Sequence, residues 1–415
     1  MKQKFLIFFL TFFMGFQSHF AFSDSFAYIS GKGSTDITLV NITTNTLGVP
    51  ISIGGSSTRL AINANDSLVY VSNNGLNAVT VIDTATNSAI GNIPTGGFPT
   101  GIVFTPNGSF AYVGERTPNT VSVINTATNS IISTIPVGTN PEGIAIRPDG
   151  AFVYVGNSGT GNVSVIDTAT NTVANTVNVG TSPIDIAITP DGAYAYVVNA
   201  GSNNVSVINT SSNAVVATVG TGTSPFAVAI SPNGTRAYVT NQITDDVTVI
   251  DIASNTAIGS IPVGNNPIDV AISADGRAAY VTNGSDDTLS VIDLITNMVT
   301  GTIPLPAGTA PHGLVLTSFV LPLQSIAVSG KAKRKDFLVE TDHFIQLNWS
   351  VPLDGAFPIL YKIYRDGAHI ASLPAGDFRS YKDHNLKRKR TYTYQVVAED
   401  SFGPAAAGSI SLKVK

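Results

Sequence analysis

The stretch Tyr238-Val239-Thr240-Asn241 is one copy of a tetrad that recurs along this chain at a constant step of 42 residues. The tyrosines that open the copies are Tyr28, Tyr70, Tyr112, Tyr154, Tyr196, Tyr238 and Tyr280. A fixed period of this length indicates a repeat architecture, because a unit that cannot bury its own apolar faces must stack on its neighbours. The sequence therefore predicts seven copies of one small structural unit.

Two further markers keep the same phase. An Asn or Asp closes a Val-Ile-Asp-like triplet 13 residues after each tyrosine, as Asp251 does after Tyr238. A proline-led apolar run ends in Pro-Asp-Gly or Pro-Asn-Gly, as the run from Pro183 ends in Pro190-Asp191-Gly192. Four short runs rich in Val, Ile, Thr and Tyr, separated by turn residues, predict four antiparallel β-strands per unit.

Strand counting decides how the units are arranged. Several strands are apolar on both faces, such as 205–208, which favours the radial packing of a β-propeller over an open solenoid with polar end caps. The chain enters at the tyrosine strand, 26–30, and the last unit ends after its first strand, 313–317. We therefore predict an all-β, seven-bladed β-propeller with four-stranded blades, closed by a blade that joins the last strand to the first three.

The region from about 26 to 317 resembles the YVTN-type β-propeller repeat family of bacterial and archaeal surface and secreted proteins. The tetrads, triplets and proline motifs carry this resemblance. The first unit departs most, with Ser57 in place of the proline and Asn65-Asp66-Ser67 in place of Pro-Asp-Gly. The resemblance implies that the proline-led strand is innermost and lines the central channel, so that closure uses an inner strand from the C-terminal end.

The first residues have the pattern of a secretory signal peptide. Lys2 and Lys4 precede an apolar run over 5–16, and Ala21-Phe22-Ser23 provides small residues for cleavage. A retained membrane helix is the alternative, but an anchor needs about 20 apolar residues. The chain has no cysteine, which excludes disulfides, thiol nucleophiles and cysteine metal ligands. We expect a protein secreted to the periplasm or cell surface of a bacterium, without a transmembrane anchor.

Charge divides the rest of the chain. Residues 24–317 carry six Lys or Arg against 18 Asp or Glu, a net charge of −12, whereas 318–415 carry 14 against nine, a net charge of +5. We predict a signal peptide over 1–23, the propeller over 24–317, a basic linker over 318–335 and a β-sandwich over 336–415. The acidic propeller argues against duplex nucleic acid as a partner. Single-stranded nucleic acid is a lesser alternative, because it needs aromatic platforms beside basic residues.

The tail loses the period and gains aromatic and basic residues. Alternating runs at 345–349 and 392–398 predict a small β-sandwich. It resembles a bacterial fibronectin type III domain, with Trp349 at the core-tryptophan position and Tyr392, six residues after Leu386, at the tyrosine-corner position. Arg388, Lys389 and Arg390 replace the family's usual Pro-Gly-Thr in this corner. Together with Lys387 they are either solvated loop residues or a basic patch for an anionic surface polymer or the acidic propeller.

No cluster of catalytic or metal-ligating residues stands out. His312 is the only histidine of the predicted propeller, so copper and haem sites are not supported. The sequence has no nucleophile elbow, phosphate loop or zinc motif. A calcium site from Glu142, Asp185 and Asp269 is weak, because hard cations prefer six or more oxygen ligands. We expect no cofactor and no metal.

The candidate site lies where the repeats differ from one another. The position after the repeat proline carries Thr58, Thr100, Glu142, Ile184, Phe226, Ile268 and His312, with Arg59, Asp185 and Asp269 next to it. If these residues begin the inner strands, they lie together at one mouth of the channel, because repeat proteins vary where they bind. We predict a ligand pocket there, in which Phe226 stacks and Arg59, Glu142 and His312 set the polarity; a water-filled channel is the alternative. The predicted ligand-binding residues are Thr58, Arg59, Thr100, Glu142, Asp185, Phe226, Asp269 and His312.

Two classes of function remain open at this point. The leading hypothesis is a secreted, non-catalytic scaffold, a rigid propeller that recognises a protein, peptide or glycan. The competing hypothesis is a metal-assisted, lactonase-like hydrolase at the channel mouth, which only the fold analogy supports. That enzyme would require Glu142, Asp185, Asp269 or His312 to converge on one ion.

Overall fold

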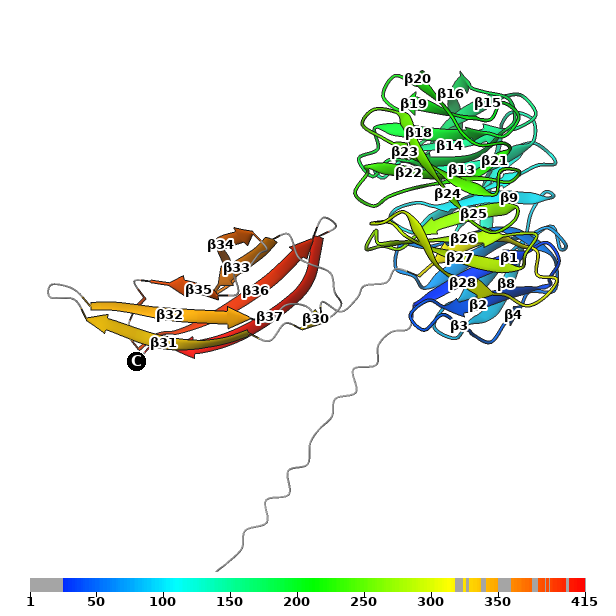
Figure 1. The fold of residues 1–415 in the computed structure, drawn as a ribbon. Helices are drawn as coiled ribbons and strands as arrows, with labels where there is room; N and C mark the ends of the chain where they lie inside the picture. The colour runs from blue at the N-terminus through cyan, green and yellow to red at the C-terminus, as the bar shows by residue number, and fades with distance from the viewer. Residues whose placement is uncertain are drawn as a thin grey trace, which may run out of the picture.

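A computed structural model describes residues 25–317, 324–325, 328–336, 341–349, 360–374, 380–384, 386–387, 389–400 and 403–414. All regular elements in these ranges are β-strands (Figure 1). No helix within these ranges is long and apolar enough to cross a membrane. The predicted signal peptide, residues 1–23, lies outside the described residues.

Residues 25–317 form seven small antiparallel sheets, each of which is one blade of a β-propeller. In Figure 1 the blades follow the chain from blue through green to yellow, and the last blade lies next to the first strands. The predicted seven-bladed, all-β propeller is therefore confirmed. Within a blade, the strands run from the channel outward in chain order, and only the blade that closes the ring departs from this order.

The strands fall into four classes by their place in the blade. The inner strands are β5 (Ser57–Ile62), β9 (Pro99–Phe104), β13 (Pro141–Ile146), β17 (Pro183–Ile188), β21 (Pro225–Ile230), β25 (Pro267–Ile272) and β29 (Pro311–Leu316). The second strands are β1 (Phe26–Gly31), β6 (Leu68–Asn73), β10 (Phe110–Glu115), β14 (Phe152–Asn157), β18 (Tyr194–Asn199), β22 (Arg236–Asn241) and β26 (Ala278–Asn283). The third strands are β2 (Asp36–Asn41), β7 (Ala78–Asp83), β11 (Thr120–Asn125), β15 (Asn162–Asp167), β19 (Asn204–Asn209), β23 (Asp246–Asp251) and β27 (Thr288–Asp293). The outer strands are β8 (Ser88–Pro94), β12 (Ser130–Pro136), β16 (Thr172–Asn178), β20 (Ala214–Gly220), β24 (Thr256–Pro262) and β28 (Met298–Pro304).

One blade joins the two ends of the propeller, as the strand count predicts. Strand β29 pairs with β1, with Tyr28 opposite Val315, and β1 continues into β2. The Thr317 amide also donates a hydrogen bond of 2.9 Å to the Phe26 carbonyl. The inner strand of this closing blade therefore comes from the C-terminal end of the repeat region.

The outer strand of the closing blade differs from the prediction of four continuous strands. It is split into β3 (Thr46–Leu47) and β4 (Ile51–Ser52), which both pair with β2. Pro50 lies between the two pieces. Proline has no amide proton to donate, so a ladder of hydrogen bonds cannot run through it.

The blades are held together by apolar clusters that each span two neighbours. In one of them Tyr154 and Val163 from one blade pack with Ile186 and Val197 from the next. Seven such clusters close the ring, and each contains one of the repeat tyrosines. The tyrosine at the step of 42 residues is therefore an inter-blade residue.

Six of these tyrosines also donate a hydrogen bond to an asparagine in the outer turn of the next blade. The pairs are Tyr28 and Asn87, Tyr70 and Asn129, Tyr112 and Asn171, Tyr154 and Asn213, Tyr196 and Asn255, and Tyr238 and Asn297. The Tyr154 hydroxyl lies 2.9 Å from Asn213 Oδ1, and Asn213 has a φ of 51°. Asparagine tolerates this left-handed conformation better than most residues, so the same residue fits the turn and accepts the hydrogen bond from the tyrosine. We call this tyrosine–asparagine hydrogen bond the tyrosine latch.

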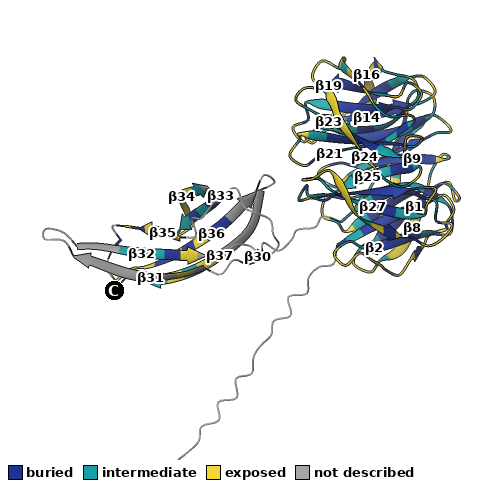
Figure 2. Ribbon diagram, in the orientation of Figure 1, coloured by how far each residue is buried: buried dark blue, intermediate teal, exposed yellow. Residues whose placement is uncertain are grey.

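The outer strands carry an irregularity that limits edge pairing. In the pairing of β7 with β8, Ile82 lies opposite Ala89 and Val81 lies opposite Gly91, so Ile90 has no partner on β7. Ile90 is 56% exposed. Figure 2 shows the outer strand β24 as mainly exposed, and only Ile261 of it is buried. Bulges twist an edge strand and disfavour pairing with another chain.

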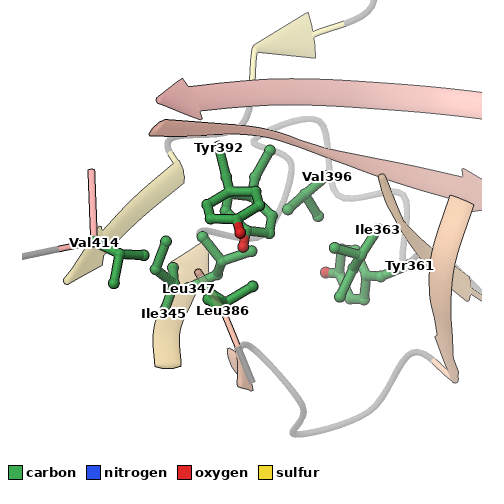
Figure 3. Close-up of a cluster of buried hydrophobic side chains, with 9 residues drawn as sticks. Ile345, Leu347, Tyr361, Ile363, Leu386, Tyr392, Val396 and Val414 are labelled. Atoms are coloured by element: carbon green, nitrogen blue, oxygen red, sulfur yellow. The ribbon is translucent and has the colours of Figure 1, made fainter. Parts of the chain in front are cut away.

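The tail forms a two-sheet β-sandwich. One sheet has the order β30 (Gln324–Ser325), β37 (Gly403–Lys413), β36 (Thr391–Asp400), β33 (Leu360–Arg365) and β34 (Ala368–Pro374). The other has the order β31 (Val328–Asp336), β32 (Thr341–Trp349) and β35 (Ser380–Asp383). Figure 3 shows the shared core, in which Ile345 and Leu347 from β32 lie with Tyr392 and Val396 from β36.

Strand β31 lies mostly within the segment 318–335 that we predict as a linker, and it pairs with β32 over its full length. The alternation of Lys331, Lys333 and Lys335 has the period of a strand, which a reading based on charge alone overlooks. The side chain of Trp349, the predicted core tryptophan, lies outside the described part of the structure.

Removal of the closing strand is expected to destroy the propeller. A chain without 310–415 lacks β29 and leaves β1 unpaired on one edge, so it should lose its cooperative thermal transition. A chain without only 321–415 keeps β29 and should melt cooperatively. Calorimetry of the two truncations checks this, and equal melting of both would contradict closure by β29.

Loss of one tyrosine latch should cost little but measurably. Tyr154→Phe removes the hydroxyl that binds Asn213 and should lower the free energy of unfolding by about 1 kcal/mol. Tyr194→Phe, on the second strand β18 of the next blade, is the control, because the Tyr194 hydroxyl makes no hydrogen bond to a described residue. Denaturant unfolding compares the two variants, and an equal loss in both would argue against the latch.

Candidate functional site

Residues that follow the repeat proline meet at one mouth of the channel. Each inner strand begins at this proline or at Ser57 in its place, so the next residue of every inner strand has the same height along the channel. A cavity of about 210 Å³ opens there. It is lined by Lys32, Thr58, Arg59, Phe98, Thr100, Arg116, Glu142, Ile184, Phe226 and His312. Six of the eight predicted site residues therefore line one cavity.

The other two predicted residues, Asp185 and Asp269, are brought to the site by Arg59. The Arg59 guanidinium lies 3.8 Å from the Asp185 carboxylate and 3.6 Å from the Asp269 carboxylate. Arg59 belongs to strand β5, whereas the carboxylates come from β17 and β25, three and five blades further along the ring. Arg59 therefore reaches across the channel, and the three side chains are at most 16% exposed.

Both carboxylates also join neighbouring inner strands. Asp185 accepts a hydrogen bond of 2.9 Å from the Val228 amide, and Asp269 accepts one of 2.9 Å from the Leu314 amide. Burial raises the pKa of both carboxyls against the opposing effect of Arg59, and the pKa of Asp269 rises to about 6. Burial alone would lower the pKa of Arg59, but the surrounding carboxylates raise it above its ordinary value.

Arg59 occupies the second position after the start of its inner strand, and several other blades carry a small residue there, which leaves space for Arg59 to cross the channel. A Cβ atom on Gly143 would lie 2.4 Å from Asp185 Cα, and one on Gly313 would lie 2.3 Å from the Thr58 carbonyl oxygen. Glycine is required where inner strands approach this closely. Four of the seven blades have Gly or Ala at this second position, so the centre of the channel has room for the long Arg59 side chain.

Phe226 and His312 form the aromatic part of the cavity wall. Their rings meet edge to face with centroids 5.3 Å apart, and Arg59 Cζ lies 5.1 Å from the Phe226 centroid. Burial, together with the charges of Arg59 and Lys32, holds the pKa of His312 well below its ordinary value. The neutral ring donates from Nδ1 to the Thr58 carbonyl at 3.1 Å, since a carbonyl can only accept.

Three residues of the cavity wall were missed by the sequence reasoning: Lys32, Phe98 and Arg116. Arg116 forms an ion pair with Glu142 and lies 5.0 Å from the centroid of the Phe98 ring. A signal for them exists in the repeats. The position four residues after the tyrosine carries Lys32, Asn74, Arg116, Ser158, Ala200, Gln242 and Gly284, so only two blades place a cation there. The position before the proline carries Phe98 once and small or amide residues elsewhere.

The charged groups of the rim influence one another. Burial raises the pKa of Glu142, while Arg116, Arg59 and Lys32 oppose this rise. Burial also lowers the pKa of Lys32; the nearby cations Arg116 and Arg59 add to this effect, and Glu142 opposes it. Among the described residues, no group of three or more His, Asp or Glu side chains is arranged to hold a metal ion. The carboxylates of the mouth instead bind Arg59 and Arg116.

The basic segment of the tail is only partly described. Lys387 and Lys389 are exposed, whereas Arg390 pairs with Asp366 at 3.2 Å. Arg388 lies outside the described residues. The Tyr392 hydroxyl accepts a hydrogen bond of 2.9 Å from the Lys387 amide, so the tyrosine ties this loop to strand β36.

Comparisons with known proteins support the propeller fold. The sequence model of the family described as "Lactonase, 7-bladed beta-propeller" matches residues 176–303, and that of "Cytochrome D1 heme domain" matches residues 63–186. A protein of unknown function from Desulfotomaculum acetoxidans DSM 771 is similar in structure, with a TM-score of 0.62 and 21% identity over 71% of this chain and 99% of its own. Hydrazine synthase from Kuenenia stuttgartiensis has a TM-score of 0.55 and 22% identity over 60% of this chain and 86% of its own. No curated protein matches the sequence.

The raised pKa of Asp269 predicts a pH-dependent contribution to stability. The group ionises near pH 3.8 when unfolded and near pH 6 when folded, so its ionisation destabilises the fold as the pH rises between these values. The free energy of unfolding of the native chain, minus that of Asp269→Asn, should therefore fall by up to about 3 kcal/mol as the pH rises from 4 to 6.5.

Chemical unfolding at several pH values measures this difference. Asp191→Asn is the matched control, because hydrogen bonds from Thr189 and Ala193 lower the pKa of Asp191. Its stability difference should stay constant between pH 5 and pH 7. A constant difference for Asp269→Asn as well would show that the carboxyl does not titrate in this range.

Proposed function

We propose that this chain is a secreted, non-catalytic binding protein whose propeller recognises a protein, peptide or glycan at the channel mouth. The signal-like segment at the N-terminus supports export. The rigid ring supplies a frame in which seven inner strands present one variable position each. Function is argued from this site and not from the fold, because propellers host unrelated activities.

One observation carries the proposal: the departures from the repeat gather in one cavity. Its ten lining residues come from six of the seven blades, although successive repeats are 42 residues apart in sequence. Three of the propeller's six Lys and Arg residues, Lys32, Arg59 and Arg116, are among them. A concave site with a few convergent polar groups and aromatic side chains is typical of ligand binding.

The tail supports a second contact surface. We propose a fibronectin type III-like sandwich, on the Tyr392 hydrogen bond to the Lys387 amide and on the two-sheet core. The exposed Lys387 and Lys389 form no ion pair with a described residue, which supports an anionic surface polymer as the partner of this loop.

A lactonase-like hydrolase is the second candidate, because the lactonase family matches residues 176–303. This segment contributes Ile184, Asp185, Phe226 and Asp269 to the site. Under the binding proposal, the purified protein should not turn over lactones with or without added divalent cations. Turnover that is lost in Glu142→Ala and His312→Ala would favour the enzyme.

A thermal-shift panel of oligosaccharides, peptides and small acids tests the binding proposal. A ligand present at a hundred times its Kd should stabilise the native chain by about 2.7 kcal/mol. Glu142→Ala should lose most of this stabilisation, whereas Thr218→Ala, an exposed residue of outer strand β20, should keep it. The proposal fails if no compound stabilises the native chain, or if every hit stabilises Glu142→Ala equally.

A further inference from the structure

We propose that the channel mouth takes a carboxylate attached to a flat, apolar body about the size of one ring. The inference rests on the proposed binding function and names the chemical class of its ligand. It stands on the distribution of charge in the propeller, on the ion pairs at the mouth, and on the size and lining of the cavity.

The cations of the propeller are concentrated at this mouth. Residues 24–317 have a net charge of −12, yet three of their six Lys and Arg residues line a single cavity of about 210 Å³. Two of the others, Arg147 and Arg236, form ion pairs with nearby Asp149 and Asp251 outside this cavity. Three cations line this recess against one carboxylate, Glu142, and such an excess of positive charge attracts anionic ligands.

At the rim, Lys32 and Arg116 carry two positive charges against the one carboxylate of Glu142, whereas Arg59 in the channel pairs with two carboxylates. Asp185 and Asp269 compensate Arg59, and Glu142 compensates Arg116. Lys32 forms no ion pair with a described residue. After burial, repulsion from Arg116 and Arg59 contributes to its lowered pKa, against the attraction of Glu142. A single negative charge would relieve this repulsion.

This balance favours a monoanion over a dianion. A carboxylate brings one charge and can accept hydrogen bonds from Lys32 and Arg116 together. A phosphate group with two charges would also approach Glu142, which is the only carboxylate among the cavity-lining residues. The negative charges of a dianion and of Glu142 repel each other inside so small a cavity, so a dianion gains less binding free energy than a monoanion.

The remaining wall fits a flat apolar group. Phe98, Ile184 and Phe226 line the cavity, and the Phe98 side chain is 38% exposed. Offset or edge contacts with such rings favour a planar partner. The cavity volume corresponds to about seven water molecules at roughly 30 Å³ each, which accommodates one ring and a carboxylate.

Isothermal titration of the mature, full-length chain with benzoate, benzamide and inorganic phosphate tests the proposal. Benzoate and benzamide share shape and differ in charge, and phosphate has charge without the ring. Benzoate should bind at least tenfold more tightly than benzamide, and phosphate should bind more weakly than benzoate. Acetyl-phenylalanine, with the same carboxylate on a peptide-like body, then distinguishes a chain terminus from a free acid as the source.

Two rim variants and one control locate the binding. Lys32→Gln and Arg116→Gln should each weaken benzoate binding roughly tenfold, which corresponds to the loss of one charged contact. Arg236→Gln also removes one cation, but from outside the cavity, and should leave the affinity unchanged. Equal thermal stability of the three variants confirms that they are folded.

The outcomes separate the ligand class from the binding function. Equal affinity for benzoate and benzamide, or equal loss in all three variants, would overturn the carboxylate. If benzoate does not bind while another compound of the thermal-shift panel still depends on Glu142, the ligand class is wrong and the binding function stands. If neither binds, both proposals fail.

Discussion

The propeller depends on apolar contacts that no single blade can make alone. Each of the seven clusters takes residues from two neighbouring blades, and a repeat tyrosine lies in every one. The stability of each blade is therefore tied to both of its neighbours, and the chain becomes stable as a ring only when β29 joins β1. The absence of cysteine makes this packing the main source of stability.

This constraint separates packing from recognition. Positions that face the neighbouring blade repeat closely, because the same cluster must form seven times. Positions that face the channel belong to none of the seven buried clusters, although Phe226 packs against one of them. They differ between blades: Thr58, Glu142, Phe226 and His312 occupy equivalent places. A regular frame thus presents an irregular mouth, which is where the proposed ligand binds.

The sequence predicted the fold and much of the site because both follow from the period. The tyrosine step and the strand count gave the seven blades and the closing strand, and the alignment of residues after the proline placed Thr58, Thr100 and Glu142 together. The split outer strand was not foreseen, although Pro50 marks it. Lys32 and Arg116 were overlooked because only inner-strand positions were compared between repeats.

The pairing of Arg59 with Asp185 and Asp269 could not be read from the sequence. It depends on which blades face one another across the ring and on how far a side chain extends, and neither follows from the spacing of repeats. The sequence placed the three residues in one region. The structure adds that Asp185 and Asp269 form ion pairs with Arg59.

The arginine that crosses the channel has a consequence for how this protein can diversify. Arg59 cannot be exchanged alone, because Asp185 and Asp269 would keep their buried charges without a counterion. Lys32 and Phe98 lie just outside strands β1 and β9, where exchange disturbs no inter-blade cluster and removes no ion pair with a described carboxylate. Evolution can therefore alter the rim residue by residue and change the preferred ligand, while the cross-channel brace stays fixed beneath it.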